Sequence, residues 1–168
     1  DTVYGINNTT YLNLLTNSFN ESETYGVAAF DSCLTNTNPP NYQTSALSSD
    51  HTSIYLENVL DICSKDVTLN WSPYLGFEVE SYEIISKIGN SSYEVIETLG
   101  ASATSYIHSN LIQDVTYHYY IRAVSTSDIT SYSNQNSRLI IRPTAATYHY
   151  LSTASHLLSN GVESVSYT

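Results

Sequence analysis

The stretch that decides the fold begins Val67-Thr68-Leu69-Asn70-Trp71-Ser72-Pro73 and has its most regular pattern later, from Leu111 to Val124. In the first part, apolar residues alternate with polar ones as far as Trp71. A period of two predicts a strand with one buried and one exposed face. Proline has no backbone N–H to donate, so Pro73 should end this strand.

The second part alternates in the same way. The side chains expected on its inner face are Tyr117, Tyr119, Ile121 and Ala123, and those on its outer face are His118, Tyr120, Arg122 and Val124. Leu111 precedes this strand across a polar bend at residues 113–114. We expect a hydrophobic core that contains Val67, Leu69, Trp71, Tyr82, Ile84, Leu111, Tyr117, Tyr119 and Ile121.

These two stretches resemble the B strand, the E–F corner and the F strand of a fibronectin type III domain. The resemblance extends from Val67 to Arg142 and implies an all-β fold in which two antiparallel sheets form an immunoglobulin-like sandwich. It places Trp71 in the core. It also implies that the Tyr117 hydroxyl is hydrogen-bonded to nearby backbone at the corner.

The composition agrees with a strand-rich extracellular protein. Sixteen tyrosines, with three phenylalanines, one tryptophan and no methionine, suit pleated strands. Five basic residues against sixteen acidic ones give a net charge of −11, which disfavours nucleic acids and anionic membrane surfaces as partners. No apolar run of about 18 residues is present, so membrane insertion is not predicted. Only 12% of the residues are charged, and a surface of hydroxyl and amide groups is typical of secreted or cell-surface proteins.

The sequence before and after the central stretch looks like parts of further modules of the same kind. We predict the C-terminal half of one module in residues 1–57, a complete module in 58–143, and the first strands of a third in 144–168. In the first part, the expected E, F and G strands are Thr9–Leu12, Tyr25–Ala29 and Ser49–Leu56, and Glu23 occupies the corner position. In the last, the expected strands are Tyr148–Leu151 and Val162–Tyr167. Such repetition is typical of an array, and the short connection at residue 57 predicts a stiff junction.

Within the central module, turn residues and alternation divide the chain further. The predicted elements are strand A at Val59–Ile62, strand C around Tyr82–Ile84, a turn at Gly89–Asn90, a returning strand at Tyr93–Thr98, strand E at Thr104–Ile107, an F–G loop at Thr126–Ser133 and strand G at Arg138–Arg142.

A closer resemblance rests on the phrases Leu60-Asp61-Ile62-Cys63, Val67 to Tyr74, Val79 to Ile84 and Ala29-Phe30-Asp31-Ser32-Cys33. They are similar to modules of large surface proteins of gliding Bacteroidetes, which are cargo of type IX secretion. This similarity implies neighbouring modules and the secretion machinery as partners. Family members often carry a cysteine pair on strands F and G, but the matching positions here are His118 and Ser137.

We find no pattern that indicates catalysis. The motifs of nucleophilic hydrolases, zinc peptidases, P-loops and dinucleotide-binding folds are absent, so we predict that the chain is not an enzyme. The five histidines, at positions 51, 108, 118, 149 and 156, are scattered, and only His149 and His156 could share a metal. We expect no cofactor, with one reservation for calcium. The oxygen-rich stretch from Asp128 to Ser133 could bind calcium, or its carboxylate could simply keep the surface soluble.

Tyrosines outside the core pattern are the candidate binding residues. Tyr120, Tyr132, Tyr148 and Tyr150 could stack on sugars or anchor a protein partner, or they could form cross-strand pairs on an outer sheet face. Five sequons begin at Asn7, Asn8, Asn20, Asn70 and Asn90. In a bacterial protein most would stay unmodified, whereas in a eukaryotic one Asn90 on its turn would be the best candidate for glycosylation.

The two cysteines leave two possibilities open. An even number on an extracellular chain suggests a disulfide between Cys33 and Cys63. In a straight array, however, a full strand would separate them, whereas a disulfide needs Cα atoms within about 7 Å.

These features predict a structural and adhesive segment of tandem modules in a large extracellular protein. The alternative is a carbohydrate-binding accessory module of a secreted polysaccharide-degrading enzyme, which would use exposed tyrosines on glycans.

Overall fold

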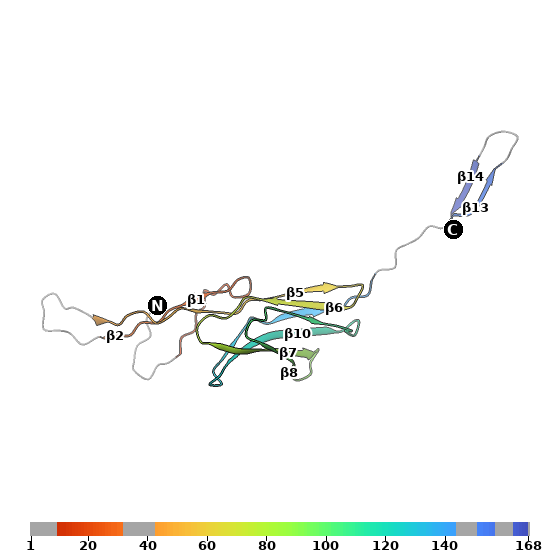
Figure 1. The fold of residues 1–168 in the computed structure, drawn as a ribbon. Coiled ribbons are helices and arrows are strands. Elements are labelled where there is room, and N and C mark those ends of the chain that lie inside the picture. The colour runs from red at the N-terminus through yellow and green to blue at the C-terminus, as the bar shows by residue number, and fades with distance from the viewer. Residues whose placement is uncertain (1–9, 32–42, 144–150, 157–162, 168) are drawn as a thin grey trace.

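The computed structural model describes residues 10–31, 43–143, 151–156 and 163–167, and this part of the chain is all-β, without a helix. Its centre is a pair of antiparallel sheets packed face to face (Figure 1). The smaller sheet contains β5 (Leu56–Asp61), β6 (Asp66–Trp71) and β9 (Ser105–His108). The larger contains β7 (Val79–Ile88), β8 (Glu94–Gly100), β10 (Thr116–Ser125), β11 (Thr130–Tyr132) and β12 (Asn136–Leu139).

The order of strands explains how the larger sheet is built. It runs β11-β10-β7-β8, and β12 pairs with β10 on the same side as β11. The predicted F–G loop at Thr126–Ser133 is therefore wrong in part, because a tight turn at 126–129 returns the chain to pair as β11. The returning strand β8 follows the predicted turn, where Gly89 has a φ of 51°, a backbone conformation that glycine adopts without a steric penalty.

The core lies between the two sheets. The side chains that face inward from β10 are buried, while those that face outward are half-buried, as alternation along a strand requires. Trp71 is only 5% exposed and packs against Tyr82, with ring centroids 5.8 Å apart. All nine residues expected in the core are buried: Val67, Leu69, Trp71, Tyr82, Ile84, Leu111, Tyr117, Tyr119 and Ile121.

The corner before β10 has the hydrogen bond that the resemblance implied. The Ile112 backbone N–H donates to the Tyr117 hydroxyl at 3.2 Å. Tyr117 is buried, and Leu111 beside this bond belongs to the core. The bond therefore fixes the segment that connects the two sheets against the beginning of β10.

The complete module begins earlier than residue 58. Leu56 pairs with Trp71 inside β5, and both Ile54 and Leu56 are buried in the core. The side chain of Asn134 accepts from the Leu56 N–H at 2.7 Å and donates to its carbonyl at 3.1 Å. The expected boundary between 57 and 58 is thus corrected, because the alternating pattern of β5 begins at Leu56 and its first residue is core.

Residues 23–31 and 43–53 form a narrow ribbon of paired segments instead of the predicted half sandwich. Its paired segments are β1 (Thr24–Tyr25) with β4 (His51–Thr52) and β2 (Phe30–Asp31) with β3 (Gln43–Thr44). Between them, serine hydroxyls accept from backbone N–H groups, as Ser48 does from Val27 at 2.9 Å.

The three strands predicted for this first part are therefore corrected. Residues 10–12 of the predicted E strand form no strand, and only Tyr25 of the predicted F strand lies in a strand, β1. The predicted G strand is divided between β4 and β5. The physical reason is that no described part of the chain packs over the apolar side chains of this segment, since Val27 is 72% exposed.

The last described strands, β13 (Leu151–His156) and β14 (Glu163–Tyr167), form an antiparallel hairpin. This hairpin is a sheet of its own and stands apart from the sandwich in Figure 1. The strand predicted at residues 148–151 begins only at Leu151 within the described residues, and 148–150 lie outside them. No helix in the described part of the chain could cross a bilayer.

Candidate functional site

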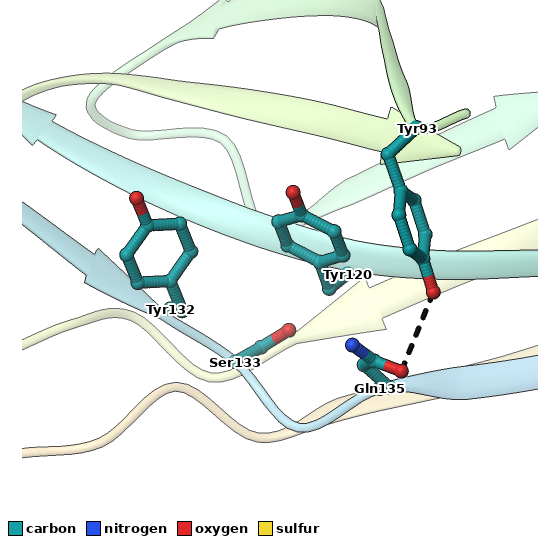
Figure 2. Close-up of a pocket in the computed structure, with 5 residues that line it drawn as sticks. All are labelled: Tyr93, Tyr120, Tyr132, Ser133 and Gln135. Atoms are coloured by element: carbon teal, nitrogen blue, oxygen red, sulfur yellow. Dashed lines mark hydrogen bonds between the residues drawn. The ribbon is translucent and has the colours of Figure 1, made fainter. Parts of the chain in front are cut away.

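A shallow pocket on the outer face of the larger sheet is the best-formed candidate site. It has a volume of about 230 Å³ and is lined by Tyr93, Tyr120, Tyr132, Ser133 and Gln135 (Figure 2). Tyrosine rings form most of its wall, and the polar groups of Ser133 and Gln135 lie along one side.

Strand alternation places these residues on the outer face. Tyr120 lies on β10 between the inward-facing Tyr119 and Ile121, so its ring points away from the core. Tyr120 pairs across the strands with Ile85 of β7. Ile85 is only 3% exposed although it does not belong to the core cluster. The outer face therefore has a small apolar centre of its own next to the tyrosines.

The three rings form a connected row. The centroids of Tyr93 and Tyr120 are 5.0 Å apart in an edge-to-face arrangement, and those of Tyr120 and Tyr132 are 6.0 Å apart. The Tyr93 hydroxyl donates to Gln135 Oε1 at 3.3 Å, which closes one end of the row. Lys87 Nζ lies 4.7 Å from the centroid of Tyr93, as a cation–π contact.

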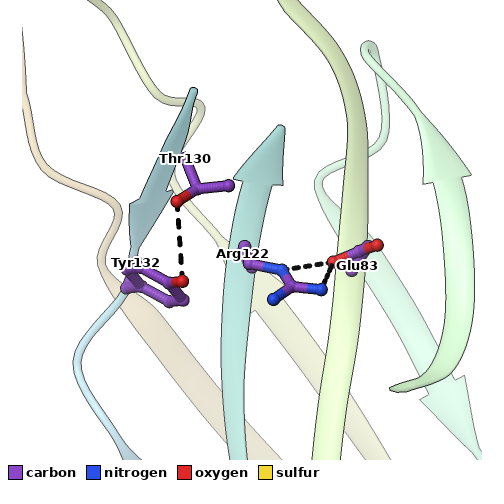
Figure 3. A network of polar contacts seen from close by, with 4 residues as sticks. All are labelled: Glu83, Arg122, Thr130 and Tyr132. Carbon is purple, nitrogen blue, oxygen red and sulfur yellow. Dashed lines mark hydrogen bonds and ion pairs between the residues drawn. The ribbon is translucent and has the colours of Figure 1, made fainter. Parts of the chain in front are cut away.

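A polar network lies beside the row and limits how Tyr132 can move (Figure 3). Arg122 faces Tyr132 of β11 on one side and Glu83 of β7 on the other, and it forms an ion pair and a hydrogen bond with Glu83. Thr130 donates to the Tyr132 hydroxyl at 3.5 Å. The charges of Arg122 and Glu83 largely cancel, so the pocket wall is close to neutral at this end.

The pKa values of the two neighbouring tyrosines are shifted in opposite directions. Burial raises the pKa of Tyr120, because an ionised phenolate loses hydration there. The hydrogen bond from Thr130, followed by that from Arg122, lowers the pKa of Tyr132 by stabilising its phenolate. The two hydroxyls point in the same direction in Figure 2, which makes them available as hydrogen-bond groups.

The structure brings together two of the four tyrosines expected as a binding surface. Tyr120 and Tyr132 share the pocket, while Tyr148 and Tyr150 lie outside the described residues. Tyr93 and Gln135 were not anticipated as site residues. Tyr93 could have been suspected from its position at the start of the strand that returns beside β7. No signal in the sequence indicated Gln135, because its position depends on the break between β11 and β12.

The described histidines with close polar neighbours contact tyrosines. His51 Nδ1 lies 2.7 Å from the Tyr74 hydroxyl, and His108 Nδ1 lies 3.1 Å from that of Tyr119. Burial lowers the pKa of His108, so its imidazole is neutral at pH 7. The predicted metal pair cannot be assessed, since His149 and the side chain of His156 are not described.

The stretch considered for calcium is occupied by strand pairing. Asp128 lies in the turn before β11, its φ is 59°, and its N–H donates to the Ser125 carbonyl at 3.0 Å. Among the residues that the structure describes, no three acidic, histidine or cysteine side chains are grouped so that they could hold a metal ion.

Cys63 is exposed in the turn between β5 and β6 and forms no disulfide with any residue that the structure describes. Cys33 lies outside the described residues, so the possible disulfide stays a prediction. Labelling of free thiols in the unreduced protein would decide it, since two reactive thiols would exclude the bond.

The pocket has the chemistry of a binding site. Aromatic faces bind apolar or C–H-rich surfaces, and the surrounding hydroxyl and amide groups can exchange hydrogen bonds with a polar ligand.

No protein-family model matches this chain, and no curated protein is significantly similar to it.

Proposed function

We propose that this chain is a structural and adhesive segment of a large extracellular or cell-surface bacterial protein, built from fibronectin type III-like modules arranged in tandem. Its role is to hold other parts of that protein at a distance from the cell. The resemblance to modules of gliding Bacteroidetes extends this proposal to a type IX secretion cargo of the gliding-adhesin kind.

The architecture of the sandwich supports the choice of module. A three-stranded sheet, β5-β6-β9, faces a larger sheet in which β10 lies between β7 and the pair β11 and β12. This strand arrangement supports a fibronectin type III-like module with a divided last strand. The hydrogen bond from the Ile112 N–H to the Tyr117 hydroxyl corresponds to the tyrosine corner of such modules.

The observation that carries the proposed role is the junction between the ribbon and the sandwich. The chain passes from β4 to β5 without a free linker. The N–H of Thr52 donates to the Leu75 carbonyl at 2.7 Å, and the N–H of Ser72 donates to the Tyr55 carbonyl at 3.0 Å. A junction bonded at successive residues transmits force and orientation, whereas a flexible linker would transmit neither.

The ends of the sandwich also suit a linear array. The chain enters at Leu56, which pairs with the last residue of β6, and leaves after Leu139, which pairs with the first residue of β10. These positions lie at opposite poles, and in Figure 1 the ribbon extends away from the entry pole. Modules joined at opposite poles extend a stalk instead of folding back.

The proposal can be tested by measuring whether ribbon and sandwich move as one body. Residual dipolar couplings of the full chain should fit one alignment tensor for residues 23–31, 43–55 and 56–140. Separate tensors for ribbon and sandwich would contradict a stiff stalk. His51→Ala, which removes the contact to Tyr74, should loosen the junction, while Tyr132→Ala on the distant sheet face should leave it unchanged.

A further inference from the structure

We infer that the pocket formed by Tyr93, Tyr120, Tyr132, Ser133 and Gln135 binds a neutral sugar ring of a glycan. This inference names a ligand class for the adhesive part of the proposed role. It does not depend on the stalk, because the pocket lies within one module and would exist in a module of any array.

The size of the pocket selects a small ligand. About 230 Å³ lies below the range of roughly 300–1,000 Å³ that drug-sized ligands occupy, and it suits a single ring. A stable protein partner would need about 800 Å² of surface on each side, which this small hollow does not supply.

The chemistry of the lining selects a ligand with both C–H faces and hydroxyl groups. Tyr132 is 52% exposed, so its ring is accessible for stacking. The hydroxyls of Tyr120 and Tyr132 point the same way, and the amide nitrogen of Gln135 points toward the centre of the pocket (Figure 2). A pyranose presents C–H groups on its faces and hydroxyls around its edge, which matches rings flanked by hydroxyl and amide groups.

Charge excludes the main competitors. A cationic ligand, which aromatic rings could otherwise bind, would meet the ammonium of Lys87, which already lies over the ring of Tyr93. A polyanionic glycan would be repelled by the net charge of −11. Arg122 is already paired with Glu83 and so offers no free positive charge. A neutral sugar meets neither obstacle.

The site is also preorganised. Tyr120 lies between the two other rings, and Ile85 opposite it is buried. Gln135 holds the Tyr93 hydroxyl at 3.3 Å. Rings that are already held in position lose little conformational freedom when a ligand binds, which favours recognition of a weakly interacting ligand such as a sugar.

The test is titration of the full, ¹⁵N-labelled chain with hexasaccharides of glucose, mannose and xylose, followed by amide chemical shifts. We expect at least one hexasaccharide to shift the amides of residues 93, 120, 132 and 135. Tyr132→Ala should weaken binding by about tenfold, the equivalent of one lost stacking contact. Tyr132→Phe keeps the ring but loses the hydroxyl, so it should weaken binding, though by less than Tyr132→Ala does.

Tyr11→Ala is the control at a second hollow, which Tyr11 lines with Asn13, Thr16, Tyr25 and Val27; Tyr11 is a tyrosine of similar exposure, 54%. It should bind like the unchanged chain, and circular dichroism should show that every variant is folded. The inference is overturned if no hexasaccharide shifts the pocket amides, or if Tyr132→Ala binds as well as Tyr11→Ala. It is also overturned if decaproline, rather than any sugar, shifts the pocket amides. Dipolar couplings with one tensor would still support the stalk in each case.

Discussion

Replacing Trp71 by alanine tests the core of the sandwich most directly. Trp71 is 5% exposed and packs against Tyr82, so truncation leaves a cavity between the two sheets. Comparable truncations of buried aromatic residues cost about 3–5 kcal/mol of unfolding free energy. The Trp71 Nε1–H, however, is buried and has no hydrogen-bond partner among the residues that the structure describes. An unsatisfied buried donor costs about 1–3 kcal/mol, and truncation removes that penalty.

The expected loss for Trp71→Ala is therefore near the lower end of this range, about 3 kcal/mol. Trp71→Phe removes the same unsatisfied donor but retains a ring, so it should cost less than about 1.5 kcal/mol. Because both variants lack the indole N–H, the difference between their unfolding free energies measures the contribution of ring packing alone.

Urea unfolding of the full chain, followed by far-ultraviolet circular dichroism, measures both values. Tryptophan fluorescence is unsuitable because Trp71 is the sole tryptophan. Ile107→Ala is the control, since Ile107 is 55% exposed on β9 and should change the unfolding free energy by less than about 0.5 kcal/mol. A loss below about 1 kcal/mol for Trp71→Ala would refute the assignment of this residue to the core.

Three further predictions concern the corner, the buried histidine and the start of the module. Tyr117→Phe should lower the unfolding free energy by about 1 kcal/mol in urea and should speed hydrogen exchange at the Ile112 amide, which loses its acceptor. The pKa of His108 is lowered in the folded protein, so the unfolded chain binds a proton first as the pH falls below about 6.5. The free energy of unfolding should therefore be highest above that pH and decline below it. His108→Gln should flatten that decline in urea titrations between pH 7.5 and 5, and an unchanged slope would contradict it. A protein of residues 54–142 should unfold cooperatively. A protein of residues 59–142 lacks the buried side chains of Ile54 and Leu56 and should be less stable by more than about 4 kcal/mol. Equal unfolding midpoints of the two proteins in calorimetry would contradict this.

Part of the candidate site could be anticipated from the sequence. Alternation assigned Tyr120 to the outer face of its strand, because the residues on either side of it had to face the core. Tyr132 was named as a binding residue, but its placement in a loop was wrong, since β11 pairs with β10. That pairing places Tyr132 opposite Arg122, and a local pattern of three residues carries too little signal to predict it.

The first part of the chain shows where a repeated pattern misleads. The alternation of Tyr25, Val27 and Ala29 matches a core strand, and the sequence predicted half a sandwich on that basis. In the structure these residues form a ribbon, and Val27 is exposed. Alternation predicts which side chains share a face, but burial of that face requires a second sheet opposite it.

The sequence by itself determined that the central region is strand-rich and which of its side chains face inward. These properties are local, because the period of two and the turn residues act within a few positions of one another. Tertiary structure alone decided that the core begins at Ile54, that β11 and β12 share β10, and that three tyrosines from separate segments meet around one pocket. Those properties depend on which strands become neighbours. Strand pairing is determined by burial of the faces of both sheets together, and it involves residues too far apart in the sequence for a local pattern to predict.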